Sequence, residues 1–329
     1  MIDVIYNPVA GPKIVNRIDR VRAYLSARGL PFRIRETAAP GDAVVMAREA
    51  ALEGADAVVA VGGDGTMNEV ADGLAGSATR LAFVPHGTGN VFAREFSLPE
   101  SVEGCLDLLS SGKTISVRMA KANDRRFVLL ASAGFDAEVV ERMHPRQKNL
   151  LGIAAYVLCG ARHLLHSQPT LWLEFPGRER VEAQAVLVVR GKKYGGNVTI
   201  APAGDIEGDT FQVIALLRKG RWSIAKFALE ALRGKHTASR HVLVRESPSL
   251  FVRSAIPSAC QVDGEYLGPL PVRFTVTDTL LQIVVPADFP FPVDPPDQCA
   301  GTLKGLGKDL WESQGGADRF LRRERDSWK

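Results

Sequence analysis

Short apolar runs that alternate with helical periodicity constrain the first 115 residues more than any other feature of the sequence. The expected strands are Ile2–Tyr6, Phe32–Glu36, 57–61 and 81–84. Helical spacing separates them, as at Met67, Val70, Ala71 and Leu74, which fall at i, i+3, i+4 and i+7. Because continuously apolar strands are typical of parallel sheets covered on both faces, we expect an α/β domain over residues 1–115.

The pattern changes near residue 116, where strand-like segments follow one another with turn residues between them. These segments are 126–133, 170–174, 183–189, 211–217, 241–245, 249–252, 272–276 and 280–285, interrupted by helical periodicity at 149–166 and 222–233. Because consecutive strands are typical of antiparallel sheets, we expect a β-sandwich domain over 116–286. Residues 287–329 are expected to be a partly helical or flexible extension. Its basic, aromatic end is either a membrane-surface segment or a frayed tail.

Composition and charge favour a globular protein of the cytoplasm. The 329 residues carry 41 Lys and Arg against 37 Asp and Glu, and a net charge of +4 does not by itself indicate nucleic acid, which is not an expected partner. No run approaches the roughly 18 consecutive apolar residues of a membrane span, and no signal peptide is visible. The four cysteines lie far apart without a CxxC pair, which argues against disulfides and zinc. We expect a cytoplasmic location, with peripheral contact to the inner face of the membrane left open.

The loop Gly62-Gly63-Asp64-Gly65-Thr66 stands between an expected apolar strand and an expected helix. Its glycines let the backbone turn sharply and approach a ligand closely, and the helix points free N–H groups at the same place, so a phosphate fits there. Asp64 would repel a phosphate, and its presence indicates an intervening Mg²⁺ held partly through water. The alternative is a tight strand-to-helix turn with Asp64 as the helix N-cap. The loop is neither a Walker A sequence nor a GxGxxG motif.

Two further turns follow neighbouring expected strands. Pro85-His86-Gly87-Thr88-Gly89-Asn90 offers a hydroxyl and two glycines, and Asn7-Pro8-Val9-Ala10-Gly11 follows the first strand. Because the carboxyl ends of parallel strands meet at one edge of a sheet, we expect all three loops to lie together. Taken alone, either of these two turns is also compatible with a plain strand-to-helix connection.

These loops belong to an ordered set of short segments that covers roughly residues 1–286. The set comprises Asn7-Pro8 with Gly11, Thr37 with Gly41-Asp42-Ala43, GGDGTMNEV at 62–70, Gly87-Thr88-Gly89-Asn90, Gly195-Gly196 before Ala201-Pro202, and Val262-Asp263-Gly264-Glu265. In this order the chain resembles the diacylglycerol kinase catalytic-domain family, which includes soluble bacterial lipid kinases and the sphingosine kinases. The resemblance implies a three-layer α/β domain like that of NAD kinase and phosphofructokinase, a C-terminal antiparallel β-sandwich, and an active-site cleft between the two.

The resemblance also implies the site residues. Asp263 is the implied catalytic base for a lipid hydroxyl, with Asp64 as a second catalytic residue. Without the resemblance, 262–265 has the pattern of an ordinary β-hairpin turn. ATP and Mg²⁺ are the implied cofactors, and the expected metal ligands are Asp64, Asp205 and Asp209. The expected nucleotide contacts are Asn7, Pro8, Val9, Ala10, Gly11, Thr37, Gly63, Asp64, Gly65, Thr66, Met67, Asn68, Glu69, Thr88 and Glu265.

Two segments depart from the family pattern. Where the family has an Asp in a VDxG strand, this chain has Val117-Arg118-Met119-Ala120, so a cation replaces a carboxylate of the metal network. Arg118 is expected either to contact a phosphate or to be compensated by Asp124. Where the family has DDG beside a structural Mg²⁺, this chain has Glu207-Gly208-Asp209, which leaves Asp205 or Asp209 to reach such an ion.

The sequence therefore predicts an ATP-dependent lipid kinase that transfers the γ-phosphoryl group to a diacylglycerol-like or sphingoid-like hydroxyl at a membrane surface. A NAD kinase-like phosphotransferase and a non-catalytic nucleotide- or lipid-binding homologue are the alternatives. The apolar segment 149–166 either flanks the lipid entrance or packs in the core. The identity of the acceptor lipid and the choice between a monomer and a homodimer stay open.

Overall fold

The computed structural model describes residues 1–11, 13–87, 89–142, 169–177, 179–195 and 198–289. All of them belong to one unit, Met1–Pro292. Predictions that concern 149–166 and the extension from residue 290 onward lie outside the described residues, as does Thr88.

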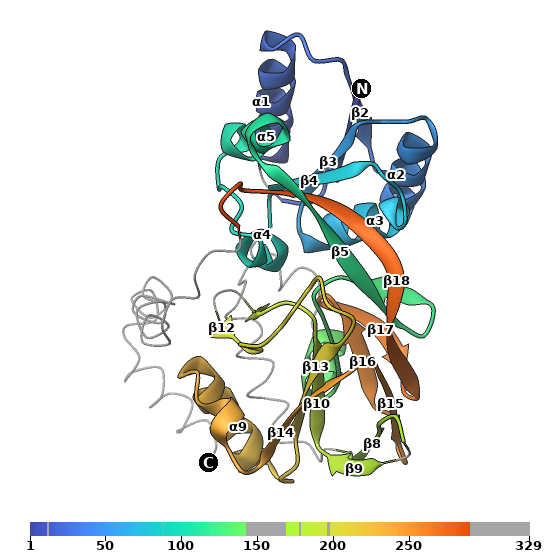
Figure 1. Cartoon of the computed structure of the whole chain (residues 1–329), viewed down its shortest axis with the longest axis vertical. Coiled ribbons are helices and arrows are strands. Elements are labelled where there is room, and N and C mark those ends of the chain that lie inside the picture. The colour runs from blue at the N-terminus through green and yellow to red at the C-terminus, as the bar shows by residue number, and fades with distance from the viewer. Residues whose placement is uncertain (12, 88, 143–168, 178, 196–197, 290–329) are drawn as a thin grey trace, which may run out of the picture. The chain divides into compact units, whose positions relative to one another are not determined.

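Four parallel strands form the first part of the fold, in the order β2-β1-β3-β4. Helices α2 and α3 cover one face of these strands, and α1 and α5 cover the other (Figure 1). Val58 and Ala60 of β3 pack with α2 and α3, whereas Val59 and Val61 pack with α1 and α5, so the predicted parallel sheet with two buried faces is confirmed. The elements are β1 (Ile2–Tyr6), α1 (Ile14–Ala27), β2 (Phe32–Glu36), α2 (Asp42–Leu52), β3 (Ala57–Gly62), α3 (Asp64–Leu74), β4 (Arg80–Pro85), α4 (Val91–Glu95) and α5 (Val102–Ser111).

The long strand β18 (Val272–Val285) continues this sheet. Its Gln282 and Ile283 pair in parallel with β4, and most of the strand pairs antiparallel with β5 (Lys113–Ala122). The prediction of two strands at 272–276 and 280–285 is wrong, because both segments pair with β5 and are separated only by a shift of register between Val276 and Leu280. Beyond β18 the sheet continues through β15 (Ser249–Ser254) to β8 (Leu171–Glu174) and β9 (Arg180–Ala183).

A second sheet is antiparallel throughout and packs against the first. Its order is β14-β13-β10-β7-β16-β17. Side chains of this sheet such as Val188 and Val213 share a core with Leu173, Leu250 and Phe274 of the first sheet, so the predicted β-sandwich is confirmed. The strands are β7 (Leu130–Gly134), β10 (Ala185–Val189), β13 (Phe211–Leu216), β14 (Val242–Ser247), β16 (Ala259–Val262) and β17 (Glu265–Pro269).

The expected strand 126–133 is divided into β6 (Arg125–Phe127) and β7. The division has a physical cause, since the backbone N–H groups of Val128, Leu129 and Leu130 donate to the carboxylate of Asp263 instead of continuing one ladder. The remaining elements are α6 (Phe135–Arg142), β11 (Lys193–Tyr194), β12 (Val198–Thr199), α9 (Arg221–Leu232) and the 3₁₀ helix η1 (His236–Ala238).

Strands β5 and β18 join the two parts of the fold, because each belongs to the sheet that runs from the parallel strands into the sandwich. The boundaries 1–115 and 116–286 therefore stay a prediction. Among the described residues, no helix is both long enough and apolar enough to cross a membrane. The described cysteines, Cys105 and Cys260, are free and buried.

Gly73 permits the close packing of α3 on α2, beneath the candidate site. A Cβ added at Gly73 would lie 2.4 Å from the carbonyl oxygen of Val44 and 2.7 Å from Cβ of Ala47. Gly73→Ala is therefore expected to lower the free energy of unfolding by about 1–3 kcal/mol, despite the higher helix propensity of Ala. Gly65→Ala on the same helix is the control, since its Cβ meets only the movable end of Glu265. Urea unfolding compares the two variants, and equal midpoints would contradict this role of Gly73.

Candidate active site

The loops after β1, β3 and β4 lie together at the carboxyl edge of the parallel strands. The backbone N–H of Asn7 donates to the carbonyl oxygen of Val61 at 3.4 Å, and the N–H of His86 donates to that of Gly62 at 2.6 Å. Glycine favours the close approach, because a Cβ on Gly87 would lie 2.9 Å from Oδ1 of Asn90 and 3.1 Å from Cα of Gly63. The structure thus brings together the three loops that the sequence placed at one edge.

Helix α3 begins in this cluster with no side-chain cap. Its N-cap is Gly63, in extended conformation, and Asp64 is the first helical residue. The first N–H groups of such a helix and its positive dipole end favour an anion, most naturally a phosphate. The side chain of Asn68, one turn further along, has a buried Oδ1 without a hydrogen-bond partner among the described residues, so a polar acceptor stands ready for a ligand.

The carboxylate of Asp64 turns toward the loop after β4. Its Oδ2 accepts a hydrogen bond from the N–H of Val91, and its Oδ1 accepts one from that of Phe92, both at 3.2 Å. The alternative that Asp64 caps its own helix is therefore wrong. The carboxylate holds the start of α4 instead, beside Gly89, where an added Cβ would lie 3.2 Å from Oδ2.

Asp263 occupies the turn between β16 and β17, in a left-handed conformation with φ of 45°. Its Oδ2 accepts from the N–H of Val128 at 2.9 Å, and its Oδ1 accepts from those of Leu129 and Leu130 at 3.0 and 2.9 Å. Burial raises the pKa of Asp263 to about 6, because desolvation outweighs these three hydrogen bonds, and the negative charge of Asp64 raises it further. The two carboxylates that the sequence places about two hundred residues apart are electrostatic neighbours in the fold.

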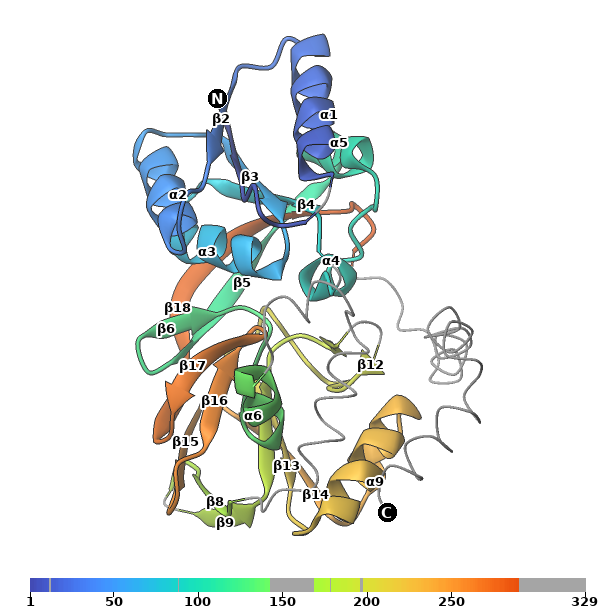
Figure 2. The ribbon, with the colours of Figure 1, turned by 180° about the vertical axis from the view of Figure 1, so that it is seen from behind.

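Glu265 completes the contact between this turn and α3. Its Oε1 lies close to Gly65, since a Cβ added at Gly65 would lie only 2.7 Å from it. Its Oε2 forms an ion pair with Nη2 of Arg125 at 3.0 Å. An ion pair between Arg126 and Asp72, at 2.9 Å, joins β6 to the same helix. The chain segments α3, β6 and β17 can be followed in Figure 2. The hairpin turn 262–265 is therefore built against the glycine loop.

The other predicted nucleotide contacts are of two kinds, the residues of the turn 7–11 and side chains that are buried or half-buried in the fold. Oδ1 of Asn7 accepts from the N–H of Val9 at 3.0 Å, which folds the Asn7, Pro8, Val9, Ala10 and Gly11 turn, and Gly11 lies against the His86 ring. Thr37 and Thr66 are buried at 8% and 7% exposure, and Glu69 is half-buried on α3. Met67 packs in the core with 1% exposure, so only its backbone is available to a nucleotide.

Sequence reasoning missed two residues that shape the site. Asn90 closes the loop after β4, since its Oδ1 accepts from the N–H of Gly87 at 2.9 Å and its Nδ2 donates to the carbonyl oxygen of Gly87 at 2.8 Å. The motif Gly87-Thr88-Gly89-Asn90 contained this signal, because Asn readily closes such turns. Arg125, which orients Glu265, had no local signal.

Comparisons with known proteins match both halves of this arrangement. Residues 2–122 match the model of the diacylglycerol kinase catalytic domain, and residues 130–285 match that of the YegS C-terminal NAD kinase beta sandwich-like domain. A diacylglycerol kinase from Bacillus subtilis (strain 168) is 30% identical over 291 residues, which cover 87% of this chain and 96% of the relative. The chain belongs to the diacylglycerol kinase catalytic-domain family.

Further similarities agree with this assignment. A diacylglycerol kinase from Staphylococcus aureus (strain Newman) is 28% identical over 291 residues, covering 87% of this chain and 92% of the relative. The crystal structure of a diacylglycerol kinase from Bacillus anthracis (strain Sterne) superposes with a TM-score of 0.65 over 86% of this chain and 96% of that chain, at 19% identity, which supports the fold alone. The names of the sequence relatives support a kinase-type enzyme.

The residues at the glycine loops fit the Mg²⁺ and ATP that this family implies. Gly63 and Gly87 allow close backbone approach, and the N-cap of α3 is Gly63, which has no side chain to cap the helix. The buried Oδ1 of Asn68 has no hydrogen-bond partner among the described residues. Asp64 adds a carboxylate, which is a ligand type that Mg²⁺ prefers. Thr88, expected to contact the nucleotide in the same loop, lies outside the described residues.

The two departures from the diacylglycerol kinase pattern lie elsewhere in the fold. Arg118 pairs through Nη1 with Oδ1 of the exposed Asp278 at 2.8 Å. Asp205 accepts from the N–H of Glu207 at 3.0 Å, and the charges of Asp205 and Asp209 act on the neighbouring Arg190. In the part of the chain that the structure describes, no group of three or more His, Cys, Asp or Glu gathers, so Asp64, Asp205 and Asp209 do not form one metal site.

Proposed function

We propose that this protein is an ATP- and Mg²⁺-dependent lipid kinase that phosphorylates the hydroxyl of a diacylglycerol-like or sphingoid-like lipid. The observation that carries the proposal is the position of Asp263, whose turn contacts the glycine loop through Glu265 and whose pKa is raised to about 6. A carboxylate with this pKa is ionised at neutral pH and basic enough to assist proton removal from an alcohol.

In the proposed reaction, the glycine loops and the start of α3 bind the phosphates, and Asp64 holds Mg²⁺. When bound, Mg²⁺ neutralises the phosphate charge during transfer. The oxygen of the lipid hydroxyl forms a bond to the γ-phosphorus, and the bond between that phosphorus and the ADP oxygen breaks. Asp263 accepts the proton that the hydroxyl loses. The three N–H groups of residues 128–130 orient the Asp263 carboxylate for this task.

The test is transfer of label from γ-labelled ATP to lipids in mixed micelles, with diacylglycerol and sphingosine compared side by side. The proposal expects a labelled, Mg²⁺-dependent lipid product. Labelling of soluble NAD or a sugar phosphate without any lipid product would replace it by the NAD kinase-like alternative. Tight binding of Mg-ATP without turnover on the whole panel would replace it by the non-catalytic alternative.

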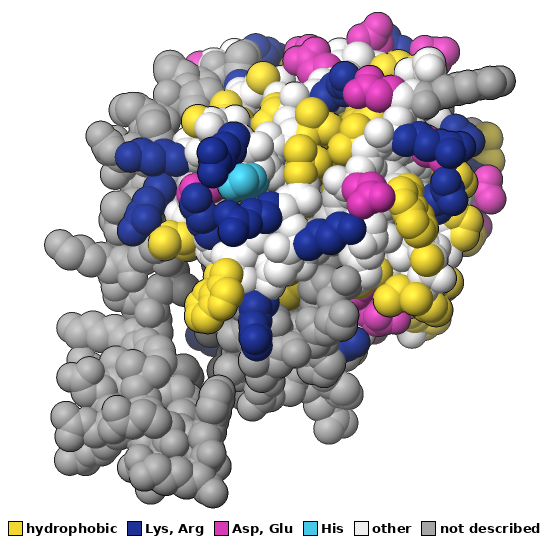
Figure 3. Space-filling view, turned by 90° about the horizontal axis from the view of Figure 1, so that it is seen from below, with side chains coloured by type: hydrophobic (Ala, Val, Ile, Leu, Met, Phe, Trp, Pro, Cys, Tyr) yellow, Lys and Arg dark blue, Asp and Glu magenta, His cyan; other side chains and the backbone are white. Residues whose placement is uncertain are grey.

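A basic face around α9 supports contact with an anionic membrane, where such a lipid resides. Figure 3 shows Lys and Arg side chains gathered around a histidine on this face. Its exposed cations are Arg218, Lys219, Arg221, Lys226, Arg233, Lys235 and Arg240. The pKa of His241 is lowered, first by burial and then by the positive charges of Arg240, Arg218 and Lys226. These three cations therefore lie near His241.

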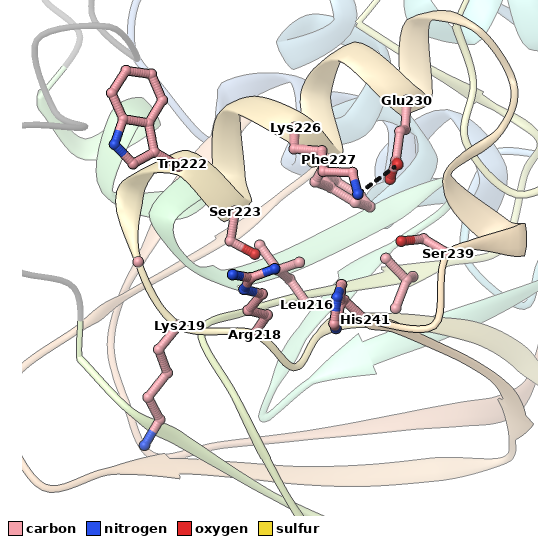
Figure 4. Close-up of a pocket in the computed structure, with 12 residues that line it drawn as sticks. Leu216, Arg218, Lys219, Trp222, Ser223, Lys226, Phe227, Glu230, Ser239 and His241 are labelled. Atoms are coloured by element: carbon pink, nitrogen blue, oxygen red, sulfur yellow. Dashed lines mark ion pairs between the residues drawn. The ribbon is translucent and has the colours of Figure 1, made fainter.

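Exposed apolar side chains accompany these charges. Trp222 is 81% exposed and Leu229 is 46% exposed, and their spacing of seven residues places both on one side of α9. Figure 4 shows Arg218, Lys226 and His241 around a pocket whose lining also includes Trp222, at the start of the helix. Cations beside an exposed Trp are typical of surfaces that bind the membrane interface.

Removing two of these cations is expected to weaken membrane binding. At about 1 kcal/mol per basic residue near an anionic surface, Arg218→Ala with Lys226→Ala should lower partitioning into phosphatidylglycerol-containing vesicles roughly 30-fold. Arg22→Ala with Arg48→Ala removes two exposed cations from α1 and α2 and serves as the matched control. Vesicle co-sedimentation measures both, and equal loss in the two pairs would contradict a role for this face.

A further inference from the structure

Arg190 is the largest side chain among the fully buried ones, with 0% exposure. It follows β10 directly, and its backbone N–H donates to the carbonyl oxygen of Leu129 at 2.8 Å. A guanidinium that is removed from water needs compensation, because an unpaired buried charge is strongly destabilising. The groups that surround the guanidinium therefore indicate the role of Arg190.

Four backbone carbonyl oxygens converge on this guanidinium. Its Nη2 donates to those of Ile206 at 2.7 Å, Arg118 at 2.9 Å and Gly208 at 3.0 Å, and its Nη1 donates to that of Thr210. The negative charges of Asp205 and Asp209 favour the charged guanidinium without a described hydrogen bond to it, whereas the positive charge of Arg118 opposes it. Burial lowers the pKa of Arg190 to about 10, so the group stays protonated at neutral pH.

Carbonyl oxygens gathered around a cation form the kind of oxygen shell that Mg²⁺ and Ca²⁺ also use. Three of the four carbonyls belong to segment 206–210, the stretch in which the family pattern has DDG beside a structural Mg²⁺. The second Asp of that pattern is Gly208 in this chain, which offers its carbonyl and no carboxylate. The fourth carbonyl belongs to Arg118, the other residue that departs from the family pattern.

We infer that the guanidinium of Arg190 takes the place of the structural divalent cation in this chain. Both departures then have one explanation, because a fixed positive charge already occupies the carbonyl shell and would repel Mg²⁺ there. The N–H of Arg118 also donates to the carbonyl oxygen of Ile206 at 3.3 Å, so β5, β10 and the segment leading into β13 are held together around Arg190. The fold is thereby independent of free Mg²⁺, whose remaining task is at the nucleotide.

The test uses the protein without nucleotide or lipid, so its outcome does not depend on the proposed kinase activity. The thermal midpoint of the natural protein is measured in EDTA and in excess Mg²⁺ or Ca²⁺. It is expected to be the same in both conditions. A midpoint that falls in EDTA, and no longer does so in Asp205→Asn with Asp209→Asn, would overturn the inference.

An exchange of cations sharpens the test. Arg190→Gln with Gly208→Asp removes the guanidinium and restores the carboxylate, and its midpoint is expected to rise on addition of Mg²⁺ or Ca²⁺. The new carboxylate must displace the side-chain end of Asp205, since a Cβ on Gly208 would lie 2.7 Å from Oδ2 of Asp205. Arg126→Gln, which removes a different guanidinium, is the control and should lower the midpoint equally with and without metal. If the exchange variant folds and its thermal midpoint does not change with divalent ions, the inference that the guanidinium replaces a divalent cation is rejected. If the variant does not fold, the comparison of the natural protein in EDTA and in excess metal decides.

Discussion

Asp263→Asn is expected to lower kcat for lipid phosphorylation by about 10²–10⁴-fold, the usual contribution of general acid–base catalysis. The amide has the shape of the carboxylate and tolerates the left-handed conformation at φ of 45°, whereas Ala would add strain. It cannot accept the hydroxyl proton. Asp278→Asn removes a fully exposed carboxylate of the same part of the fold and should retain its activity. If the Asp263→Asn variant had the kcat of the natural protein, Asp263 would lose the role of base.

The pH dependence gives a second measure of the same residue. Because the base acts when ionised and its pKa is about 6, kcat of the natural protein should rise with pH and level off above about 6. The residual kcat of the Asp263→Asn variant should lack this rise at acidic pH, the acidic limb of the pH profile. A limb at the same pH in both proteins would assign the titration to another group.

Protein stability should change in the opposite direction over this range. The pKa of Asp263 is raised from 3.8 to about 6 on folding, so between these values the folded protein binds more protons than the unfolded one. Its free energy of unfolding therefore falls as pH rises from about 4 to about 6, by roughly 3 kcal/mol for this group. Urea unfolding at several pH values should show the loss in the natural protein and a flatter profile in Asp263→Asn. Activity thus increases where stability decreases, as expected for a carboxylate held in place for chemistry.

The parts of the fold that sequence could predict are those decided by local patterns. The apolar run of β3 and the glycines after it determine a buried parallel strand and a close turn wherever they occur. The sequence also predicted that the loops of Gly63 and Gly87 lie at one edge of the sheet, because the carboxyl ends of parallel strands all lie at that edge. Helix α9 was found from its periodicity within one residue at each end.

The parts that sequence could not predict depend on partners distant in the chain. The segment 277–279 has the composition of a turn, yet β18 passes through it because β5 pairs with both sides. Asp263 was found only through the family resemblance, since its partners at 128–130 are selected by the packing of β7 against β16. Arg190 ends an apolar run like any strand-terminal cation, and only the folded chain shows which carbonyls surround it.

Asp64→Asn is expected to lower the apparent affinity for Mg²⁺, or the activity at limiting Mg²⁺, by about 10- to 100-fold. The amide oxygen can keep one of the two hydrogen bonds from the N–H groups of Val91 and Phe92, and the substitution removes the charge that attracts the ion. Titration of activity with Mg²⁺ at saturating ATP and lipid measures the effect. Asp72→Asn, on the same helix and paired with Arg126, is the control that removes a carboxylate away from the loops.

The charge of Asp64 also acts on the proposed base, which separates a metal-linked role from a purely structural one. Because Asp64 raises the pKa of Asp263, its neutralisation should lower that pKa and move the acidic limb of kcat to lower pH. If Asp64 served only to anchor α4, the variant would lose thermal stability while its Mg²⁺ midpoint stayed that of the natural protein. A shifted Mg²⁺ midpoint together with a shifted acidic limb requires that Asp64 and Asp263 act within one electrostatic site.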